Sequence, residues 1–169
     1  MNKFCITFAG VPGSSKTPIA SYLSYELGLP AFNNDVLRTE VLEDLKEFNQ
    51  NEYEKRRDER LKDLLGRGVC FIYDASVDRE WDKLKSWLEE AGYEWFVISL
   101  DFSYEFMQRL QETKGYTESI QSLDESVKQH RKFVMDYSSD IGFHLTDDQF
   151  PNRLAVCLDA AKRWLPKGN

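Results

Sequence analysis

The sequence predicts an α/β fold in which a five-stranded parallel sheet lies between two layers of helices. Short apolar runs alternate with longer amphipathic stretches along the chain, as they do when buried parallel strands are joined by helices. The chain of 169 residues has the size of one domain. It has no low-complexity tract, Pro/Gly/Ser-rich linker or internal repeat that would divide it.

Five apolar segments are the strand candidates. The first begins close to the N-terminus and is rich in strand-forming residues, as a buried parallel strand is. The second is short and weak, and the third is closed by an acid. In chain order the predicted strands cover residues 4–9, 31–33, 69–73, 95–100 and 143–145.

Seven amphipathic stretches between the strands predict helices. The first has Pro18 in its opening turn, apolar Ile19, Leu23 and Leu27 at helical spacing, and Gly28 where the pattern stops. Helix ends predicted from sequence are uncertain by about 2–4 residues. The predicted helices cover residues 16–27, 36–48, 52–66, 79–91, 104–112, 123–137 and 152–164.

A phosphate-binding loop is predicted between the first strand and the first helix. Residues 10–17 read Gly-Val-Pro-Gly-Ser-Ser-Lys-Thr, which differs at one position from the pattern G-x-x-x-x-G-K-[ST]. In such a loop backbone N–H groups line an anion site at the positive end of the helix. We expect ATP as the ligand, bound by Gly10, Pro12, Gly13, Ser14, Ser15, Lys16 and Thr17.

Three residues of the loop have individual expectations. Lys16 is expected to reach the β- and γ-phosphates, and the Thr17 hydroxyl to bind Mg²⁺. Ser15 stands where the pattern has Gly, so its side chain crowds the loop or strains a backbone angle that Gly adopts freely. The alternative function is therefore a nucleotide-binding module with weak or no catalysis.

Asp74 follows the third predicted strand and is the second metal-side candidate, beside Thr17. An acid at a strand's carboxyl end lies in the crevice where open α/β sheets bind ligands, and it can hold Mg²⁺ directly or through water. The alternative is that Asp74 caps a turn. The motifs of guanine recognition are absent, which argues against a GTPase. Ala75 follows Asp74 where an ATPase motor has a catalytic Glu, so hydrolysis is not favoured.

Asp35 and Arg38 are the candidates for chemistry on an acceptor. Phosphoryl transfer to a hydroxyl needs a group that accepts its proton and a cation that holds the acceptor. The two residues stand one turn apart at the start of the second long helix, so both can face the crevice. The alternative is that Asp35 is an N-cap and Arg38 an exposed helix charge.

These segments resemble the small P-loop kinases of the zeta-toxin, polynucleotide-kinase and chloramphenicol-phosphotransferase group. Residues 10–17, 33–38 and 69–76 carry the resemblance, which spans most of the chain. It implies a P-loop NTPase fold of the nucleoside-kinase type, with one kinase domain over 1–169 and a lid at about 111–123. The implied activity is Mg²⁺-dependent transfer of the γ-phosphate of ATP to a hydroxyl of a small molecule or of a nucleic-acid 5′ end.

The resemblance also implies roles for single residues. Asp35 would accept the proton of the hydroxyl, Arg38 would bind an anionic part of the acceptor, and Arg79 would line the same pocket. Asp74 would support Mg²⁺ or the acceptor. A toxin-like member that phosphorylates nucleotide sugars would inhibit growth when expressed, and this inhibition would depend on Asp35.

The lid and the adenine site match the group less well. Such kinases bring arginines from the lid to the transferred phosphate, but the lid segment offers only Lys114. Arg109, just before it, is the best placed remaining cation, whereas Lys128 and Arg131 are expected on a solvated helix face. The adenine is expected near the lid and residues 146–148.

The composition of the chain limits which classes of partner and which cellular compartment are expected. The net charge of −7 does not favour a long nucleic-acid track and tilts the prediction towards a small acceptor. No run approaches transmembrane length and the N-terminus lacks a signal-peptide pattern, which favours the cytoplasm and no membrane. The cysteines, Cys5, Cys70 and Cys157, are predicted to be packing residues, and two histidines make a His/Cys metal site improbable.

Overall fold

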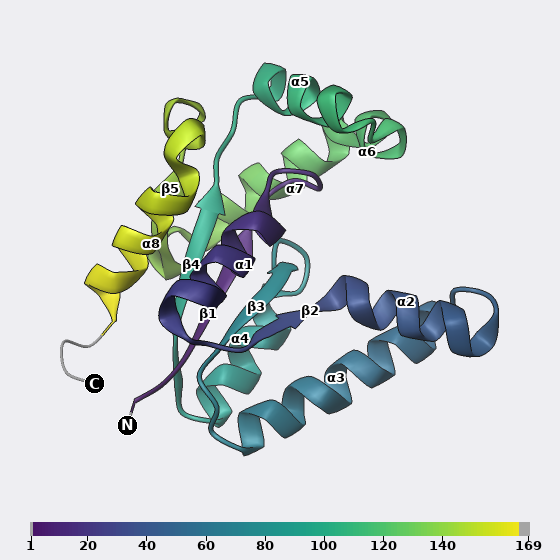
Figure 1. Cartoon of the computed structure of the whole chain (residues 1–169), viewed down its shortest axis with the longest axis vertical. Helices are drawn as coiled ribbons and strands as arrows, with labels where there is room; N and C mark the ends of the chain where they lie inside the picture. Colours follow the sequence, from purple (N-terminus) through teal and green to yellow (C-terminus); the bar gives the residue numbers. More distant parts are fainter. Residues whose placement is uncertain (1, 166–169) are drawn as a thin grey trace.

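The computed structural model describes residues 2–165 and contains one parallel sheet of five strands between helices. The order across the sheet is β2-β3-β1-β4-β5, so the first strand of the chain lies in the middle (Figure 1). This confirms the predicted fold class. The strands are β1 (Lys3–Ala9), β2 (Ala31–Asn33), β3 (Phe71–Ser76), β4 (Tyr93–Leu100) and β5 (Ile141–Leu145).

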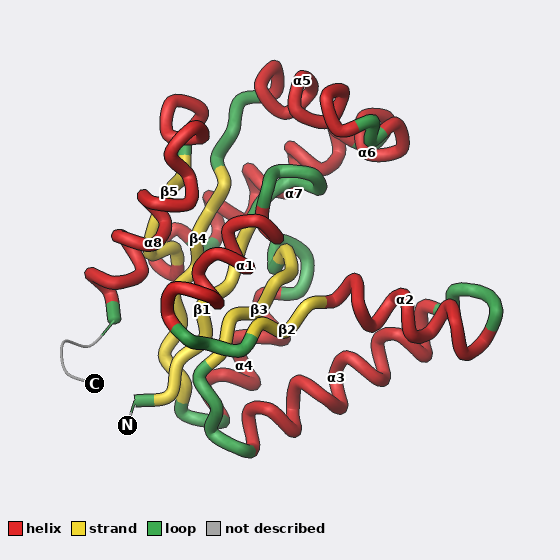
Figure 2. The backbone as a smooth tube through the Cα atoms, in the orientation of Figure 1, coloured by secondary structure: helices red, strands yellow, loops and turns green. Residues whose placement is uncertain are grey.

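Helices connect the strands and cover both faces of the sheet (Figure 2). The helices α1 and α8 pack on one face and α3 and α4 on the other, and α7 contributes side chains to both cores. Within the described residues the α-helices are α1 (Lys16–Leu27), α2 (Asn34–Leu45), α3 (Gln50–Gly66), α4 (Trp81–Glu90), α5 (Tyr104–Lys114), α6 (Thr117–Gln121), α7 (Leu123–Asp136) and α8 (Arg153–Trp164); the 3-10 helices are η1 (Ser138–Asp140) and η2 (Asp147–Asn152).

Alternate side chains of the central strand point into two separate cores. Ile6 and Phe8 of β1 join the core under α1 and α8, whereas Cys5 joins the core under α3, α4 and α7. In that second core the rings of Trp81 of α4 and Trp95 of β4 meet edge to face at 5.8 Å, which packs α4 on β4. Burial on both faces explains why the strands read as apolar runs rather than as alternating patterns.

The third strand lies further along the chain than predicted. It was expected over 69–73 with Asp74 behind it, but β3 begins at Phe71 and continues to Ser76. Asp74 therefore lies inside the strand, in register with Asn33 at the end of β2. A carboxylate is tolerated there because two neighbouring side chains, Thr17 and Asn33, donate hydrogen bonds to it.

The helices α2 and α3 form an arm that extends from the sheet edge at β2 (Figure 1). Leu37 and Val41 of α2 pack against Tyr53 of α3 in a small core of their own. This core holds the start of α2 in a fixed position beside the end of β3. No helix in the span 2–165 is long and apolar enough to cross a membrane.

Candidate active site

A cleft of about 830 Å³ lies at the carboxyl ends of the central strands. Ligand sites of open α/β sheets are found at this end of the strands. The cleft is lined by the loop 10–17, the start of α2, part of α3, the turn between β3 and α4, and the segment after α5. Its volume lies in the range of small-molecule sites.

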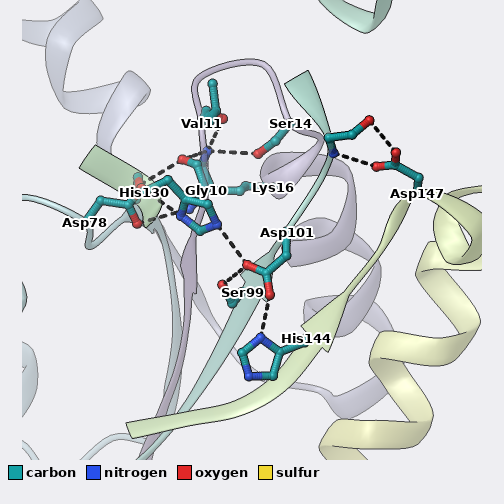
Figure 3. Close-up of polar contacts among 12 residues, drawn as sticks. Gly10, Val11, Ser14, Lys16, Asp78, Ser99, Asp101, His130, His144 and Asp147 are labelled. Carbon is teal, nitrogen blue, oxygen red and sulfur yellow. Dashed lines mark hydrogen bonds and ion pairs between the residues drawn. The ribbon is translucent and has the colours of Figure 1, made fainter. Parts of the chain in front are cut away.

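The loop at 10–17 connects β1 to α1, as predicted, and holds its own lysine. The Lys16 ammonium donates to the carbonyls of Gly10 and Val11, both at 2.8 Å, and to Ser14 Oγ at 3.2 Å (Figure 3). Burial lowers the pKa of Lys16 to about 8. Lys16 thus lies inside the loop, bonded to neutral oxygens.

Ser15 adopts the left-handed backbone conformation that the pattern reserves for glycine. Its φ is 84° and ψ 23°, at the position that caps the N-terminus of α1. A non-glycine residue there is strained by about 1–3 kcal/mol. The Ser15 hydroxyl accepts a hydrogen bond of 2.9 Å from Nε of Arg153 at the start of α8.

Thr17, Asp74 and Asn33 form a polar cluster on the β3 side of the loop. Thr17 Oγ1 donates to Asp74 Oδ1 at 3.2 Å, and Asn33 Nδ2 donates to Asp74 Oδ2 at 2.6 Å. Burial raises the pKa of Asp74, which is 8% exposed. The hydroxyl and carboxylate oxygens are ligands that suit Mg²⁺. The residues therefore fit a magnesium ion.

Asp35 is not the N-cap of α2. Asn33 is the cap, because its side-chain oxygen accepts hydrogen bonds from the backbone N–H groups of Asp35 and Val36. The Asp35 carboxylate lines the cleft, and within residues 2–165 no donor is bonded to it. The structure thus leaves this carboxylate free to accept a proton from a molecule in the cleft.

Arg38 lies one turn after Asp35 and also lines the cleft. Its guanidinium stacks on the rings of Phe48 at 5.1 Å and Tyr53 at 4.7 Å. No carboxylate in the described part of the chain pairs with it. Two aromatic rings therefore orient a cation whose N–H donors stay available to a ligand.

Two further arginines line the same cleft. Arg79, in the turn between β3 and α4, donates to Gln129 of α7 at 2.6 Å. Arg57 of α3, which the sequence did not single out, is buried and pairs with Asp58 and Glu80. Arg79 retains a net positive charge towards the cleft, whereas the charge of Arg57 is balanced by its two carboxylates.

The C-terminal end of α5 lies against the phosphate loop. Gln111 donates to the Pro12 carbonyl and Lys114 to the Gly13 carbonyl, both at 2.7 Å. The expectation for Arg109 was wrong: its side chain is exposed and does not line the cleft. Because Gln111 and Lys114 are three residues apart on one helix face, Arg109 points away from it. Lys128 of α7 is exposed, as expected.

The loop after β5, where adenine was expected, is tied to the start of α5. The Asp147 carboxylate accepts hydrogen bonds from the backbone N–H and the hydroxyl of Ser103, at 2.9 and 2.5 Å (Figure 3). Asp147 is thereby engaged in a structural contact.

A line of acids and histidines runs from the phosphate loop to the far side of β4, and sequence reasoning missed it. Asp78 accepts from the Gly10 backbone N–H at 3.1 Å and contacts His130 Nδ1 at 3.1 Å. His130 Nε2 contacts Asp101 at 2.9 Å, and Asp101 also contacts His144 (Figure 3). These residues come from four segments of the chain, so no local pattern could join them.

His130 is held as a cation by this arrangement. A carboxylate only accepts hydrogen bonds, so satisfying one at each ring nitrogen requires both nitrogens to carry protons. Burial alone would lower the pKa of His130, but the hydrogen bonds to Asp101 and Asp78 outweigh it and raise the pKa to about 9. Burial alone would raise the pKa of Asp101. The hydrogen bonds from His130, Ser99 and His144 outweigh burial and lower this pKa to about 2.

The stabilisation from His130 is expected to depend on pH. The folded pKa lies above the unfolded value of 6.5, so the contribution is complete below pH 6.5 and is lost as pH rises through about 9. We expect His130→Gln to lower the free energy of unfolding by about 3 kcal/mol at pH 6, and by much less at pH 10. Urea unfolding of both proteins at each pH measures this difference.

Lys16 also makes the free energy of unfolding depend on pH, and its lowered pKa acts in the opposite direction. Comparing the variant with the unchanged protein at each pH cancels this contribution. Arg131→Gln, one residue further on the exposed face of α7, is the matched control and should show no pH-dependent difference. A loss for His130→Gln that is the same at pH 6 and pH 10 would contradict the ion-pair explanation.

Comparison with solved structures identifies the fold. A candidate kinase from Chloroflexus aurantiacus matches over all of both chains with a TM-score of 0.68 at 17% identity. The fold is an α/β P-loop NTPase fold. A gluconokinase from Sinorhizobium meliloti matches with a TM-score of 0.60 at 14% identity, covering 95% of this chain and 93% of its own.

An APS kinase from Mycobacterium tuberculosis, in complex with AMPPNP and APS, also matches this fold. Its TM-score is 0.60 at 17% identity, covering 95% of this chain and 98% of that one. No family model matches the sequence, and no curated protein matches it. At these identities the similarity shows the fold alone.

Proposed function

We propose that the protein is an ATP-dependent phosphotransferase that moves the γ-phosphate of ATP to a hydroxyl of a small anionic molecule. The observation that carries this proposal is the free carboxylate of Asp35, which lines the same cleft as the phosphate loop. A group that can accept the hydroxyl proton and a loop that can hold the phosphate then lie on two walls of one cleft.

In this proposal the phosphates take the place that Lys16 now fills. Lys16 exchanges the carbonyls of Gly10 and Val11 for phosphate oxygens, which are charged and form stronger hydrogen bonds. Thr17 and Asp74 would hold Mg²⁺. When bound, the ion supplies positive charge to the β- and γ-phosphates.

The acceptor is proposed to carry an anionic group because of the cations in its half of the cleft. Arg38 is oriented by two rings and unpaired with acids, and Arg79 faces the same space from the β3–α4 turn. Solved kinases of this fold include one with bound APS, which supports a small acceptor. With a net charge of −7, the chain offers little to a nucleic-acid end.

A second candidate is a nucleotide-binding module with little or no catalysis. The observation that favours it is the left-handed backbone of Ser15, together with Lys114 as the cation that the lid segment brings to the loop. Such a module would bind ATP·Mg²⁺ but would give no phosphorylated product with any acceptor.

A transfer screen with ATP labelled at the γ-phosphate tests the proposal. The panel contains hydroxy acids, sugar acids, nucleoside monophosphates, neutral sugars, nucleosides, oligonucleotide 5′ ends, chloramphenicol and aminoglycosides. We expect label on an anionic small molecule and none on its neutral analogue. Label on neutral sugars or on oligonucleotides would overturn the acceptor class, and ATP binding without transfer to any acceptor would favour the nucleotide-binding module.

A further inference from the structure

Arg153 is a cation at the phosphate loop whose charge is not balanced by an acid. Its Nε donates to Ser15 Oγ at 2.9 Å and its Nη1 to the Phe150 carbonyl at 3.2 Å, and its guanidinium stacks on the Phe150 ring at 4.3 Å. Within residues 2–165 no carboxylate pairs with it. Of the five N–H donors of a guanidinium, three remain for a ligand.

A second cation stands close by. Lys114 donates to the Gly13 carbonyl, and its pKa is lowered by burial and then by the charge of Arg153. Two like charges that repel each other, both bonded only to neutral oxygens, are stabilised together when an anion lies between or beside them.

Ser15 fixes where the guanidinium of Arg153 lies. The hydroxyl is buried with its residue, which is 5% exposed, and it accepts the Nε–H. Glycine at this position would release the strain at φ 84° but would leave Arg153 without that acceptor. The serine therefore strains the backbone but holds the guanidinium of Arg153 in position.

The sheet order places Arg153 away from the transferred phosphate. Asp35 lies at the start of α2, which follows β2 at one edge of the sheet, and α8 follows β5 at the opposite edge. The γ-phosphate has to lie near the acceptor that Asp35 serves. The group that Arg153 binds is therefore a part of the nucleotide that is not transferred to the acceptor.

We propose that Arg153 binds the α- or β-phosphate of the nucleotide and that Ser15 is the residue that positions it. This inference rests on the nucleotide site of the proposed function and assigns it a residue outside the loop pattern. Ser15 is then a working part of the site, and its left-handed conformation is not a sign of a weakened loop.

Calorimetric titration of ADP, ATP·Mg²⁺ and adenosine tests the proposal on the full chain. Arg153→Gln is expected to weaken ADP and ATP by about tenfold or more and by the same factor, because both carry the α- and β-phosphates. Ser15→Ala and Ser15→Gly are expected to weaken both nucleotides, and adding either to Arg153→Gln should cause no further loss. Adenosine affinity should not change.

The control is Arg163→Gln, an exposed arginine on the same helix that is remote from the loop, and it should bind as the unchanged protein does. Tighter binding by Ser15→Gly, unchanged binding by Arg153→Gln, or additive losses would overturn the inference alone. Absence of nucleotide binding by the unchanged protein would overturn it together with the proposed function. Weakened binding of the variants without transfer by any form would support the inference and reject the kinase.

Discussion

An Asp35→Asn variant is expected to transfer phosphate about 10²- to 10⁴-fold more slowly than the unchanged protein, the usual contribution of a positioned base. Asparagine keeps the size of the side chain and the capping of α2, which depends on Asn33. It removes the carboxylate oxygen that is proposed to accept the hydroxyl proton. The measurement is kcat with the acceptor found in the screen, beside the dissociation constant for ATP·Mg²⁺, which should stay nearly unchanged.

Glu43→Gln provides the matched control, since Glu43 is an exposed acid on the same helix and does not line the cleft. It should keep full turnover and full nucleotide affinity. An Asp35→Asn protein with full turnover would exclude the role of Asp35 as a base. Equal losses in turnover and in ATP affinity would instead point to a role in holding the nucleotide.

Lys16→Met is expected to lower kcat/KM by about 10²- to 10³-fold, as the loss of one preorganised charge at a transition state does. Methionine has a similar length, so the variant removes the ammonium more than the packing. The loop loses three internal hydrogen bonds, to Gly10, Val11 and Ser14. Steady-state kinetics and ATP·Mg²⁺ titration, with thermal unfolding to check the fold, measure the outcome.

Lys55→Met on the exposed side of α3 serves as the control and should be indistinguishable from the unchanged protein. Because Lys16 is proposed to contact phosphates in both the bound and the transition state, nucleotide affinity should fall as well as turnover. A Lys16→Met protein with normal kcat/KM would contradict the assignment of residues 10–17 as the phosphate site.

The sequence predicted those parts of the site that lie close together along the chain. Residues 10–17 form a continuous loop between a strand and a helix, so their spacing was sufficient. The position of Asp35 and Arg38 on one helix turn was also local and was found. Backbone strain at Ser15, one of the two effects expected there, also followed from a single departure from a pattern that has glycine at this position.

Contacts between distant segments could not be predicted in this way. His130 and Asp78 are 52 positions apart, and Arg153 and Ser15 are 138 apart. Their partners depend on which strands become neighbours, and that order is set by packing of the whole sheet. The placement of Arg109 differs for another reason: the phase of α5 directs Gln111 and Lys114 to the loop instead.

The central position of β1 has a consequence for how nucleotide and folding are linked. The loop that follows β1 is held by Ser76 and Asp78 on one side and by Arg153 on the other. These contacts exist only after the whole sheet has assembled, because residues far along the chain make them. A ligand of the loop therefore binds the native chain and not the unfolded one. Each tenfold increase of the free ligand concentration above the dissociation constant adds about 1.4 kcal/mol to the free energy of unfolding of the entire domain.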